Sequence, residues 1–97
     1  MRTVIVNITK EPFDIYIGRA GRGEDGYFGN PFRMGNGISR DDAVQKFRRY
    51  FAGRIENSEF KRRVLALKGK RLGCFCKPNA CHGDVIADWL NKMELTA

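Results

Sequence analysis

The hydrophobic pattern at the start of the chain is that of two short strands. Residues 3–8 are rich in β-branched side chains, a polar break with a proline follows, and residues 14–18 resume a strand-like pattern. A third strand is expected at residues 71–75, an apolar run that ends close to Cys76. The chain therefore opens with two strands and returns to a third much later.

Apolar residues recur at helical intervals in three other segments. In the first, which runs to Gly53, Ser39 and Asp42 have the spacing of a helix N-cap with an acidic third position. In the second, Asn57 and Ser58 can cap a helix that Gly69 ends. The third helix closes the chain. The three apolar faces consist of Ala43, Val44, Phe47, Tyr50 and Phe51, of Phe60, Val64 and Leu67, and of Val85, Ile86, Trp89, Leu90 and Met93.

These elements predict a single small α/β domain over residues 1–97, with a sheet of three or four strands flanked by about three helices. Between the second strand and the first helix, residues 18–37 contain seven of the eleven glycines and show no apolar periodicity. We expect this segment to be a long glycine-rich loop that is ordered by its aromatic residues and folds over the corner formed by residues 76–84. Long loops of this kind in small domains are often functional.

Composition adds a basic charge and a reducing environment to this picture. The formal net charge is +7, which favours an anionic partner such as a nucleic acid or a nucleotide phosphate. The N-terminal apolar run is too short for a signal-peptide core, and no stretch approaches membrane-spanning length. With three cysteines and no export pattern, we expect reduced thiols in a cytoplasmic protein without membrane contacts.

All three cysteines and the single histidine lie within nine positions, at Cys74, Cys76, Cys81 and His82. Structural zinc sites usually separate paired ligands by two to four residues, whereas here one pair is separated by one residue and the other pair is adjacent. On a strand, Cys74 and Cys76 would share a face with Cβ atoms about 6–7 Å apart. That arrangement could fit a ligand pair, but a free cysteine near the middle of a strand is commonly a small buried apolar residue. We therefore expect no cofactor and a packing role for Cys74 and Cys76, with zinc retained as an alternative.

The start of the closing helix is the expected site of any chemistry. A Cys81 thiolate there would be favoured by the helix dipole and by Lys77, although adjacent helical residues do not face each other, so His82 is a poor base for Cys81. His82 is either a general base or a structural residue, and Asp84 either assists it or only complements the helix dipole. These alternatives stay open, and the candidate catalytic residues are His82, Asp84 and Cys81.

Arginines in the glycine-rich segment are candidate phosphate ligands. Arg19 and Arg22 lie among glycines, where a guanidinium can bind an anion through paired hydrogen bonds, although a solvated basic turn is an equal alternative. The Gly-x-Gly-x-x-Gly pattern at residues 21–26 is not a dinucleotide fingerprint, because no helix follows it directly.

Three motifs together resemble the phage and bacterial domain-of-unknown-function family numbered 4326. They are the Tyr-Ile-Gly-Arg of residues 16–19, the Phe-Gly-Asn-Pro-Phe of residues 28–32, and the Leu-x-Cys-x-Cys-x-Pro-x-x-Cys-His-Gly-Asp of residues 72–84. Two departures are a phenylalanine at residue 28, where relatives often have tryptophan, and a longer segment between residues 19 and 28. The resemblance implies that Arg19, Asn30, Cys81, His82 and Asp84 belong to one constellation, and it implies no established activity.

The hypothesis from the sequence is a site for a small phosphate-bearing nucleotide or nucleoside derivative, and the sequence does not distinguish binding from turnover. Arg19 and the amides of the third helix would hold the anion, Asn30 and Phe32 would contact the organic part, and His82 would polarise it or transfer a proton with Asp84. The remaining ligand-binding candidates are Arg22 and Lys77.

Two alternatives remain beside it. The first is a basic nucleic-acid-binding accessory protein, stabilised or not by a metal, that uses exposed arginines of the two central helices: Arg48, Arg49, Arg62 and Arg63. The second is a phage protein that binds a host protein. The oligomeric state is left open.

Overall fold

The computed structural model describes residues 2–19, 21, 23, 26–32, 35, 37–77 and 79–96. Within them, three parallel strands form one sheet in the order β1 (Val4–Asn7), β3 (Arg71–Cys74) and β2 (Ile15–Tyr16). The central β3 pairs on both sides, with Leu72 opposite both Ile5 and Ile15. The strands predicted from the hydrophobic pattern are confirmed, but each is shorter. In particular, β3 ends at Cys74, so Cys76 lies outside the strand.

Two helices between β2 and β3 begin where their capping residues predict. The side chain of Ser39 accepts a hydrogen bond from Asp42 N at 3.1 Å and completes a capping box before α1 (Arg40–Arg54). Asn57 accepts one from Phe60 N at 2.9 Å before α2 (Ser58–Leu65). Both caps are confirmed. The predicted ends differ, because α1 continues through Gly53 to Arg54, and α2 ends at Leu65, before the buried Leu67 and the predicted terminator Gly69.

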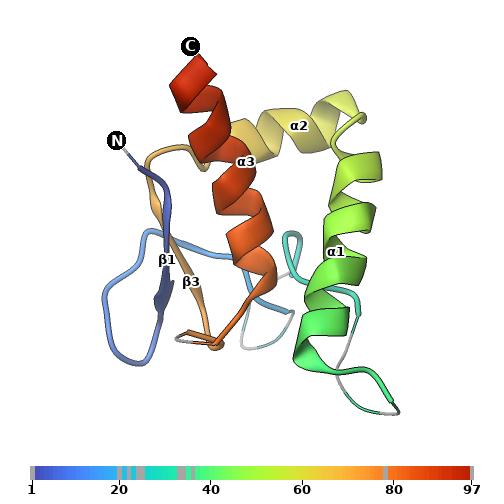
Figure 1. The fold of residues 1–97 in the computed structure, drawn as a ribbon. Helices are drawn as coiled ribbons and strands as arrows, with labels where there is room; N and C mark the ends of the chain where they lie inside the picture. The colour runs from blue at the N-terminus through green and yellow to red at the C-terminus, as the bar shows by residue number, and fades with distance from the viewer. Residues whose placement is uncertain are drawn as a thin grey trace.

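The closing helix, α3 (His82–Thr96), lies between the sheet and α1 (Figure 1). It approaches the sheet closely at Gly83, where an added Cβ would lie 2.7 Å from Ile17 Cδ1 and 2.9 Å from Ile5 Cδ1. A glycine is therefore required for α3 to begin this near to β1 and β2. Cys81 directly precedes the helix instead of lying inside its first turn, as had been expected.

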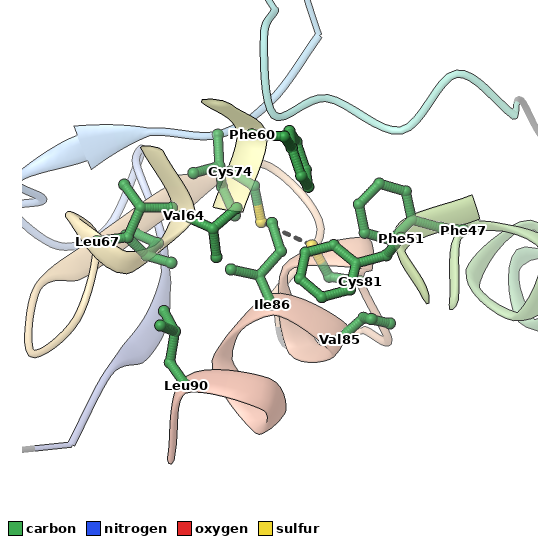
Figure 2. Close-up of a cluster of buried hydrophobic side chains, with 12 residues drawn as sticks. Phe47, Phe51, Phe60, Val64, Leu67, Cys74, Cys81, Val85, Ile86 and Leu90 are labelled. Carbon is green, nitrogen blue, oxygen red and sulfur yellow. Dashed lines mark hydrogen bonds between the residues drawn. The ribbon is translucent and has the colours of Figure 1, made fainter. Parts of the chain in front are cut away.

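The core joins the sheet to all three helices, and two of its members are cysteines (Figure 2). Cys74 and Cys81 are each 1% exposed and lie among Phe47, Phe51 and Ile86, while Cys76 is half-buried at the margin of the cluster. The architecture confirms a small α/β domain. It also places the end of β3 and the start of α3 against one another in the interior.

Several arginines of the two central helices contact neighbouring side chains. The guanidinium of Arg54, at the end of α1, lies over the Phe60 ring at 4.3 Å and donates to Tyr50 Oη at 2.6 Å. Arg62 and Arg63 both form ion pairs with Glu59. Aromatic and acidic neighbours thus engage part of the charge that had suggested nucleic acid.

Two further expectations are addressed only in part. Of the predicted glycine-rich loop, residues 20, 22, 24, 25, 33, 34 and 36 lie outside the described residues. Among the helices in the described part of the chain, none has both the length and the apolar character needed to cross a membrane.

Candidate functional site

A cavity of about 160 Å³ lies beyond the carboxyl ends of β2 and β3. Arg19 follows β2, Phe75 and Cys76 follow β3, and His82 begins α3, and all four line the cavity. Arg40, the first residue of α1, closes another side. In open parallel sheets, ligands bind outside the carboxyl ends of the strands, and this cavity occupies that position.

The segment between β3 and α3 is held in place from β1. Asn7, the last residue of that strand, donates through Nδ2 to the carbonyl oxygens of Phe75 at 3.3 Å and Lys77 at 2.8 Å. A turn then forms as Asn79 N donates to Cys76 O at 2.8 Å. These contacts bend the chain back immediately after β3, which brings Cys76 towards the helix start.

As a result, the three cysteine sulfurs converge. All three Sγ atoms lie within 4.8 Å of one another, and Cys74 Sγ is 3.1 Å from Cys81 Sγ (Figure 2). Gly83 N donates to Cys81 Sγ at 3.4 Å. The expected packing role placed Cys74 near the middle of a strand, and this placement is wrong because Cys74 is the last residue of β3.

The pKa values of the three thiols are shifted in different directions. The hydrogen bonds from Cys74 and then Cys81 lower the pKa of Cys76, and the positive charge of Arg40 adds to this effect. In turn, the hydrogen bond with Cys76 raises the pKa of Cys74. Those with Cys74 and Cys76, together with burial, raise the pKa of Cys81. The direction of these pKa shifts favours Cys76 as the thiolate, whereas the sequence had favoured Cys81.

His82 is buried, and both of its ring nitrogens are in contact with the protein. Nε2 lies 2.8 Å from the carbonyl oxygen of Ile17 and Nδ1 lies 3.6 Å from Cys81 Sγ. Burial lowers the pKa of His82, so the ring is neutral near pH 7. Because a carbonyl oxygen only accepts, Nε2 carries the proton and Nδ1 presents its lone pair to Cys81. The expected poor geometry between Cys81 and His82 does not arise, since Cys81 precedes the helix.

Lys77 and Asp84 pair with each other beside this cluster. Lys77 Nζ lies 2.6 Å from Asp84 Oδ1, and Asp84 Oδ2 accepts from Cys81 N at 3.1 Å. Asp84 thus caps the first turn of α3, which is the role that helix electrostatics favours. Neither residue is among those that line the cavity.

Arg19 and Asn30 line the cavity, and their side chains also organise the Asn-Pro-Phe segment. Arg19 donates through Nε to Asn30 O at 3.2 Å and through a terminal nitrogen to Phe32 O at 3.0 Å. Asn30 accepts from Phe32 N at 2.9 Å and donates to Ala43 O at 3.2 Å. Phe32 itself packs edge-on against Tyr50, away from the cavity lining.

Of the residues named from the sequence, the structure brings Arg19, Asn30, Cys81 and His82 to one cavity. It sets Phe32, Lys77 and Asp84 outside the lining, and Arg22 lies outside the described residues. Their roles in binding or catalysis stay predictions.

Sequence reasoning missed several residues of this site. Cys74 and Cys76 had been assigned to packing, and the lining also includes Tyr16, Arg40 and Phe75. The closely spaced cysteine pair beside a strand end was the signal for the first two. Arg40 follows the N-cap Ser39, but nothing in its local sequence separates it from the other arginines.

Comparison with known proteins places nearly the whole chain in one family. Residues 5–92 match the family described as Domain of unknown function (DUF4326). The chain is also similar to an "Uncharacterized 12.4 kDa protein in nrdA-td intergenic region" of Enterobacteria phage T4, with 39% identity over 90 residues that cover 92% of this chain and 78% of the relative. No solved structure matches.

Proposed function

The chain belongs to the family described as Domain of unknown function (DUF4326), and we propose that it binds a small phosphate-bearing ligand, a nucleotide or nucleoside derivative, at the carboxyl edge of the sheet. The observation that carries the proposal is the cavity that Arg19 and Arg40 line together with Tyr16 and Phe75. Guanidinium groups recognise phosphate oxygens, and aromatic rings stack on nucleobases.

The size of the cavity indicates how such a ligand would lie. Sites that enclose drug-sized molecules usually measure about 300–1,000 Å³. At about 160 Å³, this cavity holds only part of a nucleotide. Its floor includes Ala43, Val44 and Cys74, which suits the flat and less polar base. The phosphate then stays at the rim, where Arg40 is half-exposed and Arg19 is exposed.

An exposed aromatic residue at the cavity supports this orientation. Phe75 is 51% exposed, and its ring meets that of Tyr16 edge-on, with the centroids 6.3 Å apart. Exposing a ring to water is unfavourable unless a partner covers it. A base stacked on Phe75 removes this apolar surface from water.

The proposal assigns binding and no chemical step. The hydrogen-bonding atoms of Asn30 and both ring nitrogens of His82 are in contact with the protein itself. The predicted contacts of Asn30 with the ligand and proton transfer by His82 therefore stay predictions.

A thermal-shift screen of nucleoside monophosphates, nucleosides and inorganic phosphate tests the proposal. At least one nucleotide is expected to raise the Tm, and Arg40→Ala is expected to weaken its binding by roughly 10- to 150-fold, since a hydrogen bond to a charged group contributes about 1.5–3 kcal/mol. Arg48→Ala is the matched control, because Arg48 is exposed on the same helix and does not line the cavity.

Two results contradict the proposal. The first is that no nucleotide shifts the Tm. The second is oligonucleotide binding that weakens steeply with salt, is lost when Arg48 and Arg49 are changed to glutamate, and is unaffected by Arg40→Ala. This second result favours the nucleic-acid-binding alternative.

A further inference from the structure

The three cysteines have a geometry that packing alone does not require. Cys74 Sγ and Cys81 Sγ lie 3.1 Å apart, and these atoms and Cys76 Sγ are all within 4.8 Å of one another. Each sulfur comes from a different position: the end of β3, the following turn and the residue before α3. A hydrophobic core gains nothing from gathering three thiols at one point, whereas a metal site needs this convergence.

We propose that Cys74, Cys76 and Cys81 hold a mononuclear zinc ion, with Nδ1 of His82 as the fourth ligand. This nitrogen lies 3.6 Å from Cys81 Sγ but outside the group that the three sulfurs form, so the ring has to move towards the ion. In a tetrahedral site with Zn–S bonds of about 2.3 Å, neighbouring sulfurs lie about 3.8 Å apart. The Cys74–Cys81 pair, at 3.1 Å, has to open by about 0.7 Å, and the two separations that involve Cys76 do not exceed 4.8 Å.

The distance from Cys81 to His82 also fits this geometry. With a Zn–N bond of about 2.0–2.1 Å, a sulfur and a nitrogen on one tetrahedral edge lie about 3.6 Å apart. The separation of Cys81 Sγ and His82 Nδ1 is 3.6 Å. Two adjacent residues therefore supply two ligands, because only the second of them is inside the helix.

His82 has the orientation of a metal-bound histidine whose second ring nitrogen is already hydrogen-bonded to the protein. Its Nε2 donates to the carbonyl oxygen of Ile17 at 2.8 Å, which leaves the lone pair of Nδ1 facing Cys81. Metal-bound histidines usually donate their other ring N–H to a carbonyl or a carboxylate, which fixes the tautomer. In this site the fold provides the acceptor from the residue after β2.

Charge and ligand count favour zinc over other metal groups. Three thiolates with one Zn²⁺ carry a net charge of −1, which Arg40 beside the cluster and the N-terminus of α3 offset. Iron–sulfur clusters are typically held by four cysteines, and the chain has three. Binding releases to solvent the protons that the thiols still carry.

The site stands independently of the proposed ligand. The ion would join β3 to α3 at the floor of the cavity, so its main effect is on stability. Zinc content is measured without any nucleotide, so failure of either proposal can be distinguished from failure of the other.

The test is zinc stoichiometry by elemental mass spectrometry on chain that has been reduced, reconstituted with zinc and separated from excess metal. We expect one zinc per chain for the wild type and for Asn79→Ala, an exposed change in the same turn. Cys76→Ser is expected to lose the zinc, and since Cys76 is only half-buried, the variant is expected to remain folded by circular dichroism. Wild-type chain that is folded but holds no zinc overturns the proposal.

Cobalt substitution of the wild type provides a second measurement if a cysteine variant does not fold. Co²⁺ is expected to give thiolate-to-metal charge-transfer absorption with the intensity of three Co–S bonds, together with the visible bands of a tetrahedral ion. His82→Ala is expected to keep the charge-transfer absorption, to change the visible bands and to bind at least about tenfold more weakly. An unchanged visible spectrum in His82→Ala contradicts the assignment of the fourth ligand. Formation of a Cys74–Cys81 disulfide in the presence of equimolar zinc contradicts the site itself.

Discussion

The close approach of α3 to the sheet predicts opposite effects for the same substitution at two helical glycines. In Gly83→Ala, the new methyl group would lie 2.7 Å from Ile17 Cδ1 and 2.9 Å from Ile5 Cδ1. Carbon atoms in contact normally lie about 3.5–4.0 Å apart, so the neighbours have to move by about 1 Å. Ile17 is fully buried, and Ile5 is half-buried.

The expected magnitude combines two terms. Overpacking a buried site costs roughly 1–3 kcal/mol, and replacing glycine by alanine in a helix returns up to about 1 kcal/mol. Gly83→Ala should therefore reduce the free energy of unfolding by about 1–2 kcal/mol and lower the Tm by roughly 4–16 °C.

Gly53→Ala is the matched control, because a Cβ at this position near the end of α1 meets nothing within 4 Å. This variant should be stabilised by up to about 1 kcal/mol. Urea unfolding of both variants, monitored by circular dichroism, measures the difference. Equal effects of the two changes, or a stabilised Gly83→Ala, would refute the close approach of α3 to the sheet.

Two further predictions concern buried polar groups. Asn91 accepts from Thr3 N at 2.9 Å and donates to Thr3 O at 3.0 Å. Asn91→Ala should therefore reduce the free energy of unfolding, measured in urea, by about 2–4 kcal/mol. A loss below about 1 kcal/mol contradicts this pairing. Burial lowers the pKa of His82, so in metal-free protein the unfolded chain binds the proton more readily than the folded chain. The contribution of His82 to stability should be complete above about pH 6.5. It should decrease as the pH falls from there towards the lower pKa of the folded state. This decrease is measured by urea unfolding between pH 5 and 7.5, and its persistence unchanged in His82→Phe contradicts the assignment.

The sequence predicted those parts of the fold that depend on neighbouring residues. Ser39 and Asn57 cap their helices through bonds to residues three positions later, so a short motif was sufficient. The apolar periodicity likewise located the three helices, because each helix buries one face. The family resemblance is also confirmed, because residues 5–92 match the family.

The convergence of the cysteines was not predictable from local sequence. It depends on where β3 ends and on the bonds from Asn7 to the carbonyl oxygens of Phe75 and Lys77, which are 68 and 70 residues away in the chain. The position of Arg40 also depends on distant parts of the chain, because only the packing of α1 beside α3 brings Arg40, the first residue of α1, to the cavity. The backbone turns between Cys74 and Cys81, and the spacing of the cysteines along the chain does not reveal this turn.

The most direct test of the central claim is an NMR titration of the ¹⁵N-labelled chain with the nucleotide that gives the largest thermal shift. We expect saturable chemical-shift changes that cluster at the carboxyl edge of the sheet, at Gly18, Arg19, Phe75 and Cys76. In Arg40→Ala these changes should need roughly 10- to 150-fold more nucleotide. Changes that cluster instead on α2, or on the exposed face of α1 around Arg48 and Arg49, would contradict a ligand site at the end of the sheet.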